Sequence, residues 1–360
     1  MYQGVLLGHP LMYQCTRFVT RHKPLTQKQW LQRMAHMPET ELGIDLYSSG
    51  PAIEILEQKM AAVLGQEKAL FVHKGSVGQY SALMHWSEIT GNKKIAIHPQ
   101  SHMQVDESLA YEKLLGLEAH MFGEPNHAIT VEDVNQLPKD LCVICVELPT
   151  RRAGFLLPEW ETLLAVKAVS KANGIPLHFD GARLLESADY WGKTYKEVSA
   201  LADTTYVSLY KTLGAAAGGV IAGNNEVIEQ LKPWRSRLAG DLFTAFPYVL
   251  TSLWGIEHYL PRIFEFNERA QTLSTIIKEK IGEKAIPNPI QNNGFLVELP
   301  ISPKELEEKA LKIAEKDKIW LFDRIYKTER DTSRFEIQVG DALDDWTNEE
   351  YVEKLASLLN

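Results

Sequence analysis

Residues 178–183 read His-Phe-Asp-Gly-Ala-Arg, and residues 208–214 read Ser-Leu-Tyr-Lys-Thr-Leu-Gly. Each segment closes a short apolar run, which covers residues 175–179 in the first case and residues 205–209 in the second. Such runs are typical of strands that are buried on both faces of a parallel sheet. Ligands of open α/β sheets bind beyond the carboxyl ends of the strands. The pattern therefore predicts that Asp180 and Lys211 face one crevice.

The residues after Lys211 are small, since residues 214–219 read Gly-Ala-Ala-Ala-Gly-Gly. A backbone without bulky side chains can approach a flat ligand closely, and a lysine amine can form an imine (Schiff base) with a carbonyl. An acid one strand away, Asp180, can keep a pyridine nitrogen protonated. These are the two groups that pyridoxal 5'-phosphate requires. A surface lysine and a helix-capping aspartate are the alternative for either residue alone, but the paired motif favours the cofactor.

The two motifs, His-x-Asp-Gly-Ala-Arg and Ser-x-x-Lys-x-x-Gly-x-x-x-Gly, resemble those of the threonine aldolase and beta-eliminating lyase family. This resemblance extends from about Gly43 to about Gly340. It implies an α/β fold of the pyridoxal-phosphate-dependent, aspartate-aminotransferase-like type (fold type I), with a mostly parallel sheet in the large domain and a small α+β C-terminal domain. It also implies roles for four residues: Asp180 at the pyridine nitrogen, Lys211 as the imine-forming lysine, Arg183 at the substrate carboxylate and Ser208 at the cofactor.

The composition is that of a globular enzyme acting on small molecules. The chain has 360 residues, 45% of them hydrophobic, and a formal net charge of -9. An acidic balance argues against binding nucleic acid through a broad basic surface. We expect no membrane partner, because no apolar run approaches the roughly 20 residues that cross a bilayer. The three cysteines are too few for a disulfide framework and we find no leader sequence, so we expect a cytoplasmic protein.

Cys142 and Cys145 formally spell a Cys-x-x-Cys motif, but they lie within the apolar run of residues 141–146. We interpret them as buried packing residues and expect no metal site.

The pattern along the chain predicts three parts: an N-terminal arm over residues 1–42, a large cofactor-binding domain over residues 43–250, and a small C-terminal domain over residues 251–360. Within the arm, Thr26 is a plausible cap for a helix over residues 26–34.

A strand, a glycine turn and a helix follow one another at residues 69–86. The start of a helix offers unpaired N–H groups and the positive end of the helix dipole, which suit a phosphate. Such units are common, so the pattern alone is weak. The resemblance implies that Gly75, Ser76 and Gln79 receive the cofactor phosphate. It further implies that Arg237 approaches the phosphate across a subunit boundary, the alternative being a solvated helix end.

His102 follows the predicted strand at residues 94–97 and precedes Glu107 by five positions. By resemblance, this histidine stacks on the pyridine ring and takes the proton of the substrate hydroxyl. A histidine suits that task because its pKa lies near neutrality. The alternative is a histidine that merely caps a loop.

Residues 147–151 read Glu-Leu-Pro-Thr-Arg, where many aldolases have Glu-Asn-Thr-His. Arginine stays protonated and cannot be the general base. Arg151 therefore binds substrate or water, or pairs with Glu147 as scaffold, and Arg152 stands beside it. Arg334 matches the C-terminal arginine of the family, which clamps the substrate carboxylate. The alternative for Arg334 is a surface arginine on an edge strand.

The resemblance, together with these residues, implies a pyridoxal 5'-phosphate-dependent aldolase that cleaves L-threonine, L-allo-threonine or a related β-hydroxy-α-amino acid into glycine and an aldehyde. A β-eliminating lyase, a racemase or a transaminase with the same cofactor is the nearest alternative, and a catalytically silent cofactor-binding regulator is the third. A nicotinamide dehydrogenase is disfavoured, because no Gly-x-Gly-x-x-Gly follows the early strands. The partner is a small amino acid, and the resemblance implies a homodimer or homotetramer with active sites at the subunit interface.

Overall fold

The structure, a computed structural model, describes residues 2–328, 330 and 332–360. The chain forms two compact units. One unit spans Thr26–Pro261, and the other combines the first 25 residues with Arg262–Asn360. The partition predicted from the sequence, with boundaries after residues 42 and 250, remains a prediction about independently folding parts.

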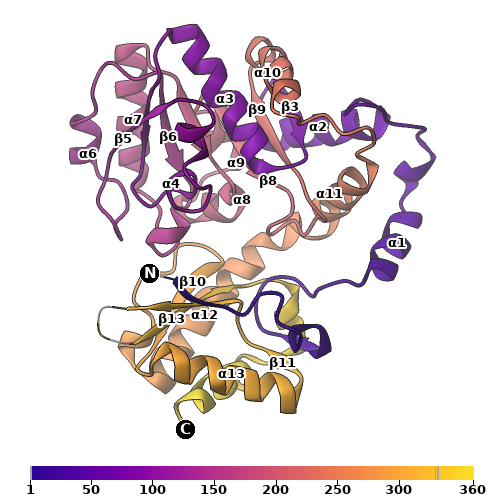
Figure 1. Ribbon diagram of the computed structural model, residues 1–360, viewed down its shortest axis with the longest axis vertical. Helices are drawn as coiled ribbons and strands as arrows, with labels where there is room; N and C mark the ends of the chain where they lie inside the picture. Colours follow the sequence, from indigo (N-terminus) through magenta and orange to yellow (C-terminus); the bar gives the residue numbers. More distant parts are fainter. Residues whose placement is uncertain (1, 329, 331) are drawn as a thin grey trace. The chain divides into compact units, whose positions relative to one another are not determined.

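The larger unit contains one seven-stranded sheet (Figure 1). Its strands are β3 (Lys68–Val72), β4 (Lys94–Ile97), β5 (Glu118–Met121), β6 (Val143–Glu147), β7 (Leu177–Asp180), β8 (Thr204–Ser208) and β9 (Gly219–Gly223). They lie in the order β3-β9-β8-β7-β6-β4-β5. Strand β9 runs antiparallel to both β3 and β8, whereas the other four neighbouring pairs are parallel, so the predicted mostly parallel sheet is confirmed.

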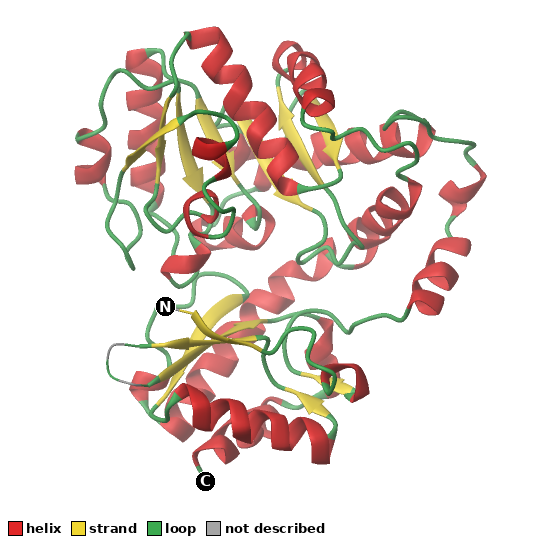
Figure 2. Cartoon of the chain, in the orientation of Figure 1, coloured by secondary structure: helices red, strands yellow, loops and turns green. Residues whose placement is uncertain are grey.

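The larger unit also contains helices, most of which flank this sheet (Figure 2). They are α1 (Gln27–Ala35), α2 (Pro51–Leu64), α3 (Gly75–Thr90), α4 (His102–Val105), α5 (Ala110–Lys113), α6 (Val131–Asn135), α7 (Trp160–Asn173), α8 (Leu184–Ser187), α9 (Tyr195–Ser199), α10 (Asn225–Arg237) and α11 (Phe246–His258). Short 3-10 helices are η2 (Pro38–Glu41), η3 (Arg151–Ala153), η4 (Ala188–Trp191) and η5 (Leu260–Arg262). Helices α3 and α10 pack on each other and on β9, whereas α2 packs on β3, β9, α9 and α11.

The central strands of this sheet are buried along their whole length, as strands covered on both faces must be. Every residue of β6, β7, β8 and β9 is buried. Cys142 and Cys145 are free thiols within the same apolar core, as the sequence predicted. The predicted cap of the first helix is also present, since Gln29 N donates to Thr26 Oγ1 over 3.3 Å.

The smaller unit has an antiparallel sheet. Its strands are β1 (Tyr2–Val5), β10 (Gly294–Leu299), β12 (Arg324–Lys327) and β13 (Ser333–Gln338), in the order β1-β12-β13-β10. A second sheet pairs β2 (Arg17–Phe18) with β11 (Ile319–Trp320). The helices are α12 (Ile263–Ile281), α13 (Pro303–Asp317) and α14 (Asn348–Ala356), with 3-10 helices η1 (Met12–Gln14), η6 (Glu283–Ala285), η7 (Asp341–Asp345) and η8 (Ser357–Leu359).

In β10, buried Phe295, Val297 and Leu299 alternate with partly exposed Leu296 and Glu298. This period of two is typical of an antiparallel sheet with one face on the core and the other toward solvent. The α+β character predicted for the C-terminal region is confirmed.

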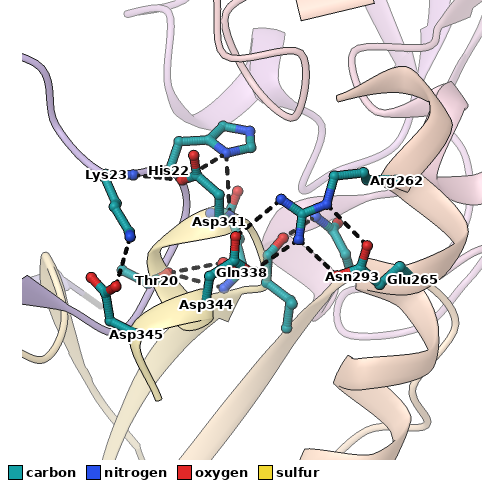
Figure 3. A network of polar contacts seen from close by, with 11 residues as sticks. Thr20, His22, Lys23, Arg262, Glu265, Asn293, Gln338, Asp341, Asp344 and Asp345 are labelled. Atoms are coloured by element: carbon teal, nitrogen blue, oxygen red, sulfur yellow. Dashed lines mark hydrogen bonds and ion pairs between the residues drawn. The ribbon is translucent and has the colours of Figure 1, made fainter. Parts of the chain in front are cut away.

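The start of the chain, predicted only as an arm, contributes strands to the sheets of this smaller unit. In Figure 1 the indigo strand β1 lies in the same sheet as the gold strands of the C-terminal region. Polar contacts hold the segment that follows β2 (Figure 3). Gln338 N donates to Thr20 Oγ1 over 3.0 Å, Lys23 N donates to Asp341 Oδ1 over 2.8 Å, and Lys23 Nζ lies 2.7 Å from Asp345 Oδ1. The first 25 residues therefore fold with a partner about 300 residues away in sequence.

Among the described residues, no helix is long and apolar enough to cross a membrane. The same residues contain no cluster of three or more His, Cys, Asp or Glu side chains suited to a metal ion.

Candidate active site

The polar residues predicted to act together follow the carboxyl ends of neighbouring parallel strands. Glu147 ends β6, Asp180 ends β7 and Ser208 ends β8. Glu147 is the register partner of Asp180, and Asp180 is the register partner of Tyr206. Parallel strands of matching register end at the same edge of a sheet, so these side chains are delivered to one place.

Asp180 is almost completely buried at this edge. Its Oδ1 accepts a hydrogen bond from Ala182 N over 3.2 Å. Burial raises the pKa of Asp180, and the positive charges of Lys211 and His102 offset only part of that effect. A buried carboxyl group of this kind is stabilised as a carboxylate by any cation placed against it.

Lys211 lies in the loop between β8 and β9. Burial and the charge of Arg183 lower its pKa to about 7, although Asp180 and Glu147 act in the opposite direction. A substantial fraction of the amine is therefore uncharged near neutral pH and can act as a nucleophile.

Helix α11 supports the loop that carries Lys211. A Cβ atom at Gly255 would lie 1.9 Å from Leu213 O, so only glycine lets the helix approach the loop backbone this closely. Thr251, one turn earlier, accepts a hydrogen bond from Ala216 N over 3.1 Å. The segment after the lysine is thus held by direct contact with helix backbone.

His102 begins α4, in the loop region beyond β4. Its Nδ1 lies 2.7 Å from Glu107 Oε1, and Glu107 also accepts a hydrogen bond from the Tyr80 hydroxyl of α3. Burial lowers the pKa of His102, but the bond to Glu107 and the nearby carboxylates outweigh it, so the pKa is raised. With Nδ1 committed to Glu107, Nε2 is the nitrogen that can accept a proton.

Glu147 is buried and joins two loops. Its Oε2 accepts a hydrogen bond from His102 N over 2.7 Å, and its Oε1 accepts one from Arg151 N over 3.3 Å. Burial and the charge of Asp180 raise its pKa to about 7, although the bond from His102 N acts to lower it. The pair Glu147 and Asp180 therefore keeps a proton to a higher pH than two exposed carboxyl groups would.

Arg151 and Arg152 both contact Asp106, the residue directly after α4. Arg151 Nη2 lies 2.8 Å from Asp106 Oδ2, and Arg152 Nε lies 2.9 Å from the same oxygen. Arg152 Nη2 donates to the other oxygen of Asp106. Burial raises the pKa of Asp106, but the two guanidinium groups outweigh this effect and lower the pKa to about 2. The cluster is therefore ionic across the physiological range.

Arg183 is buried, and its guanidinium carbon lies 5.5 Å from the centre of the Phe155 ring. Glu186 of α8 is also buried and accepts a hydrogen bond from Thr212 Oγ1, the neighbour of Lys211. Burial raises the pKa of Glu186, whereas the bond from Thr212 and the charge of Arg183 lower it in part. Glu186 thus links the loops that carry the arginine and the lysine.

The residues predicted for a phosphate lie at the first turn of α3. Gly75 is the first helical residue, and a Cβ atom there would lie 2.7 Å from Tyr206 Oη. Ser76 follows it and is partly buried. Gln79 is buried, and its Oε1 accepts a hydrogen bond from His178 Nε2, while His178 Nδ1 lies 2.9 Å from Thr204 Oγ1. The structure thus directs the Gln79 oxygen toward His178.

The remaining predicted residues lie as follows. Ser208 Oγ is 3.0 Å from Tyr206 Oη. Arg237 is exposed, and its guanidinium carbon lies 4.4 Å from the centre of the Trp234 ring. Arg334, in β13 of the smaller unit, donates from Nε to Glu298 Oε2 over 2.6 Å. Arg237 and Arg334 thus each have a neighbour within their own unit, Trp234 for the first and Glu298 for the second.

The chemistry of these side chains fits pyridoxal 5'-phosphate. Lys211 offers a partly uncharged amine for its aldehyde, and Asp180 offers a buried carboxylate for its ring nitrogen. Gly75 begins α3, and the N-cap residue Lys74 makes no side-chain cap bond to this helix, so the first turn suits an anion.

Comparison with known proteins agrees with this chemistry. The family described as beta-eliminating lyase matches residues 31–299. The chain belongs to this family. Low-specificity L-threonine aldolase 1 of Arabidopsis thaliana is 25% identical over 295 residues, which cover 79% of this chain and 82% of the plant protein.

Two solved structures are similar along nearly the whole chain. One is from Listeria monocytogenes EGD-E, assigned as a candidate L-allo-threonine aldolase, with a TM-score of 0.88 and 29% identity over 97% of this chain and 98% of that one. The other is from Exiguobacterium sp. 255-15, assigned as a candidate aromatic amino acid beta-eliminating lyase or threonine aldolase, with a TM-score of 0.87 and 28% identity over the same shares. Membership of this lyase family and the fold type I architecture, both expected from the motifs, are confirmed.

The sequence analysis did not predict two residues of the candidate active site, Asp106 and Glu186. The signal for Asp106 was the doublet Arg151-Arg152 after a buried strand, since two arginines next to a core need an acid partner. The signal for Glu186 was an acidic residue inside the apolar stretch at residues 184–188.

Proposed function

We propose that the protein is a pyridoxal 5'-phosphate-dependent aldolase that cleaves L-threonine or L-allo-threonine, and related β-hydroxy-α-amino acids, to glycine and an aldehyde. The observation that carries this proposal is the position of His102. Its Nδ1 is bound to Glu107, and its ring lies close enough to Asp180 for the two charges to interact. An aldolase needs a base for the hydroxyl proton of the substrate. The similarity to proteins named as threonine aldolases supports the same reaction.

The larger unit would hold the cofactor through residues of three loops. Lys211 is the residue that bonds to it, Asp180 is the partner of its ring nitrogen, and Ser208 lies between them along the chain. Gly75 and Ser76 are proposed for the phosphate, together with Gln79 and, from a second subunit, Arg237. When bound, pyridoxal 5'-phosphate supplies an electron sink for the bond that breaks at the amino acid Cα.

Arginine side chains are proposed to orient the substrate. Arg183 is buried beside Lys211 and carries a permanent positive charge suited to a carboxylate. Arg334 is proposed as a second ligand of that carboxylate from its motif position alone. Arg151 either contacts the substrate or serves as scaffold. Its bond to Asp106 favours the scaffold role.

His102 is the proposed base. Its Nδ1–H is directed at Glu107, so Nε2 has the free electron pair of the neutral ring. The substrate hydroxyl would give its proton to Nε2, and Glu107 would stabilise the imidazolium that results. The rate then depends on how rigidly the ring is held, because a misplaced base loses the benefit of proximity.

The proposed assembly follows from the resemblance, and the proposed location from the low cysteine content. We propose a homodimer or homotetramer with active sites at the subunit interface, located in the cytoplasm. Light scattering after size-exclusion chromatography tests the assembly: a mass near that of a single chain would contradict it.

The test of the reaction uses the purified protein with pyridoxal 5'-phosphate and L-threonine or L-allo-threonine. Acetaldehyde is followed by its reduction with NADH and alcohol dehydrogenase, and glycine by chromatography. We expect equal amounts of both products, and none from the Lys211→Ala variant. His102→Asn should lower kcat by roughly 100-fold, the scale of one general base.

A β-eliminating lyase is the second candidate, because Arg151, which cannot act as a base, stands where many aldolases have histidine. Pyruvate and ammonia from L-serine, with no acetaldehyde from either threonine, would replace the aldolase proposal by this one. No product from any amino acid would favour a silent cofactor-binding protein.

A further inference from the structure

Two segments of the candidate site are joined by two carboxyl groups. One is the loop after β4, which contains α4, and the other is the loop after β6, which contains η3. Glu147 joins their backbones, since its two oxygens accept hydrogen bonds from His102 N and Arg151 N. Asp106 joins their side chains, since it lies on the α4 loop and contacts both arginines of η3. The two connections are independent, because they use different atoms of each loop.

The Asp106 connection is protected from solvent. The exposed fractions of the side chains are 14% for Asp106, 9% for Arg151 and 20% for Arg152. Arg152 contacts both oxygens of the carboxylate, which is the two-bond arrangement that fixes direction as well as distance. A buried, multiply bonded ion pair has a defined geometry, unlike a solvated one.

His102 is held by this framework from several sides. Its N–H is bound by Glu147, and its carbonyl oxygen accepts the N–H of Asp106 over 2.9 Å. Its Nδ1 is bound by Glu107, the residue directly after Asp106. Displacement of Asp106 would therefore move both the carbonyl partner of His102 and the residue that orients its ring.

We propose that Asp106, Arg151 and Arg152 form a brace that positions His102, so that the two arginines act on the reaction through the histidine rather than by contact with the substrate. The proposal rests on the proposed function in one respect, namely that His102 is the base. The brace itself is a statement about the protein without cofactor or substrate, and it can be tested there.

The charges around His102 give the brace a measurable consequence. The groups that face the imidazole are Glu107 and Asp106 of its own loop, Glu147 of β6 and Asp180 of β7. Asp106→Asn removes one negative charge and leaves two guanidinium groups less compensated. The imidazolium form of His102 loses stabilisation, so the pKa of His102 should fall. The acid limb of the pH profile should move to lower pH with it, because the base works in its neutral form.

The experiment compares wild type with Asp106→Asn, Arg151→Gln and the double variant. The pKa of His102 is measured by NMR on histidine-labelled protein without cofactor, and its signal is assigned as the one lost in His102→Asn. Steady-state kinetics on the holoenzyme follow. We expect the pKa of His102 to fall in Asp106→Asn, and kcat to fall about 10- to 100-fold with KM changed less than about threefold.

The double variant separates positioning from substrate contact. If Asp106 and Arg151 act as one unit, the double variant should be no slower than the slower single variant. A direct substrate contact by Arg151 predicts the opposite pattern: Arg151→Gln raises KM with kcat unchanged, and Asp106→Asn has no effect. That pattern, or an unchanged His102 titration in Asp106→Asn, overturns the brace.

Two controls complete the test. Asp140→Asn removes an exposed ion pair with Lys94 and should leave the titration and kcat unchanged. If Asp106→Asn fails to fold, Arg152→Lys is measured instead, because it keeps the charge and loses the two-bond fork. Arg152→Lys should then lower kcat without moving KM, and unchanged kinetics would overturn the proposal. If the wild-type protein releases no aldehyde, the proposed aldolase function is refuted. The titration of His102 tests the brace alone.

Discussion

Glu147 and Asp180 lie side by side, as register partners at the carboxyl ends of two neighbouring parallel strands. Their residues are 8% and 5% exposed. Two carboxyl groups this close in a buried position cannot both be ionised without a large cost, and the pKa of Glu147 rises to about 7. The negative charge that this pair carries is a reason for the site to attract cations, among them a protonated ring nitrogen.

This pair predicts how stability depends on pH. The folded-state pKa of Glu147 lies above its usual 4.5, so the native protein holds more protons than the unfolded chain between about pH 4.5 and 7. Its contribution to stability is present at low pH and is lost as pH rises through that window. The free energy of unfolding should therefore decline as pH rises through this window, and we expect Glu147→Gln to make that decline smaller by up to about 3 kcal/mol. Urea unfolding of the cofactor-free protein at pH 5 and pH 8 measures it, and identical declines in both proteins would contradict it.

Lys211 should be reactive near neutral pH. Its pKa is lowered to about 7, whereas a free lysine titrates near 10.4. In the cofactor-free protein, trinitrobenzenesulfonate should modify Lys211 with a half-maximal rate near pH 7, as followed by peptide mass spectrometry. Arg183→Gln removes a neighbouring positive charge and should move the midpoint to higher pH. A wild-type midpoint at the value of free lysine would refute this expectation.

Gly75 should not tolerate a side chain. An added Cβ would lie 2.7 Å from Tyr206 Oη and 3.1 Å from its Cζ, and Tyr206 is fully buried. Gly75→Ala should destabilise the fold by roughly 1–3 kcal/mol through overpacking, and weaken cofactor binding. Urea unfolding and absorbance titration with pyridoxal 5'-phosphate are the measurements. Tyr206→Phe removes the nearer atom and should restore part of the loss; an additive double variant would mean that the clash is elsewhere.

Arg334 and Glu298 provide a matched pair of variants. If Arg334 binds the substrate carboxylate, Arg334→Gln should raise KM roughly 10- to 100-fold, the range of one charged hydrogen bond. Glu298→Gln removes the partner of Arg334 on β10 and should change KM by less than about threefold. Equal losses of melting temperature in both variants with KM unchanged would show that the pair only supports the sheet.

The central elements could be read from the sequence because their signals are local. The predicted strand at residues 94–97 forms β4 with those bounds, and the apolar runs at residues 175–179 and 205–209 overlap β7 and β8. An unbroken apolar run or a period of two is written in adjacent residues. Strand β5 was not predicted, because residues 118–121 read Glu-Ala-His-Met, which is no apolar run, and they are exposed or half-buried at the edge of the sheet. Strands β1 and β2 were missed because their partners lie some 300 residues later.

The sequence by itself determined the family and the mostly parallel sheet, and its strand-end motifs indicated that Asp180 and Lys211 lie close enough for their charges to interact. Only the tertiary structure decided the charges around them. The bond of Asp106 to Arg151 joins residues 45 apart, and that of His178 to Gln79 joins residues 99 apart. Such contacts depend on which loops meet at a sheet edge and how deeply they are buried, and burial is what moves the pKa of Lys211 and Glu147 to about 7.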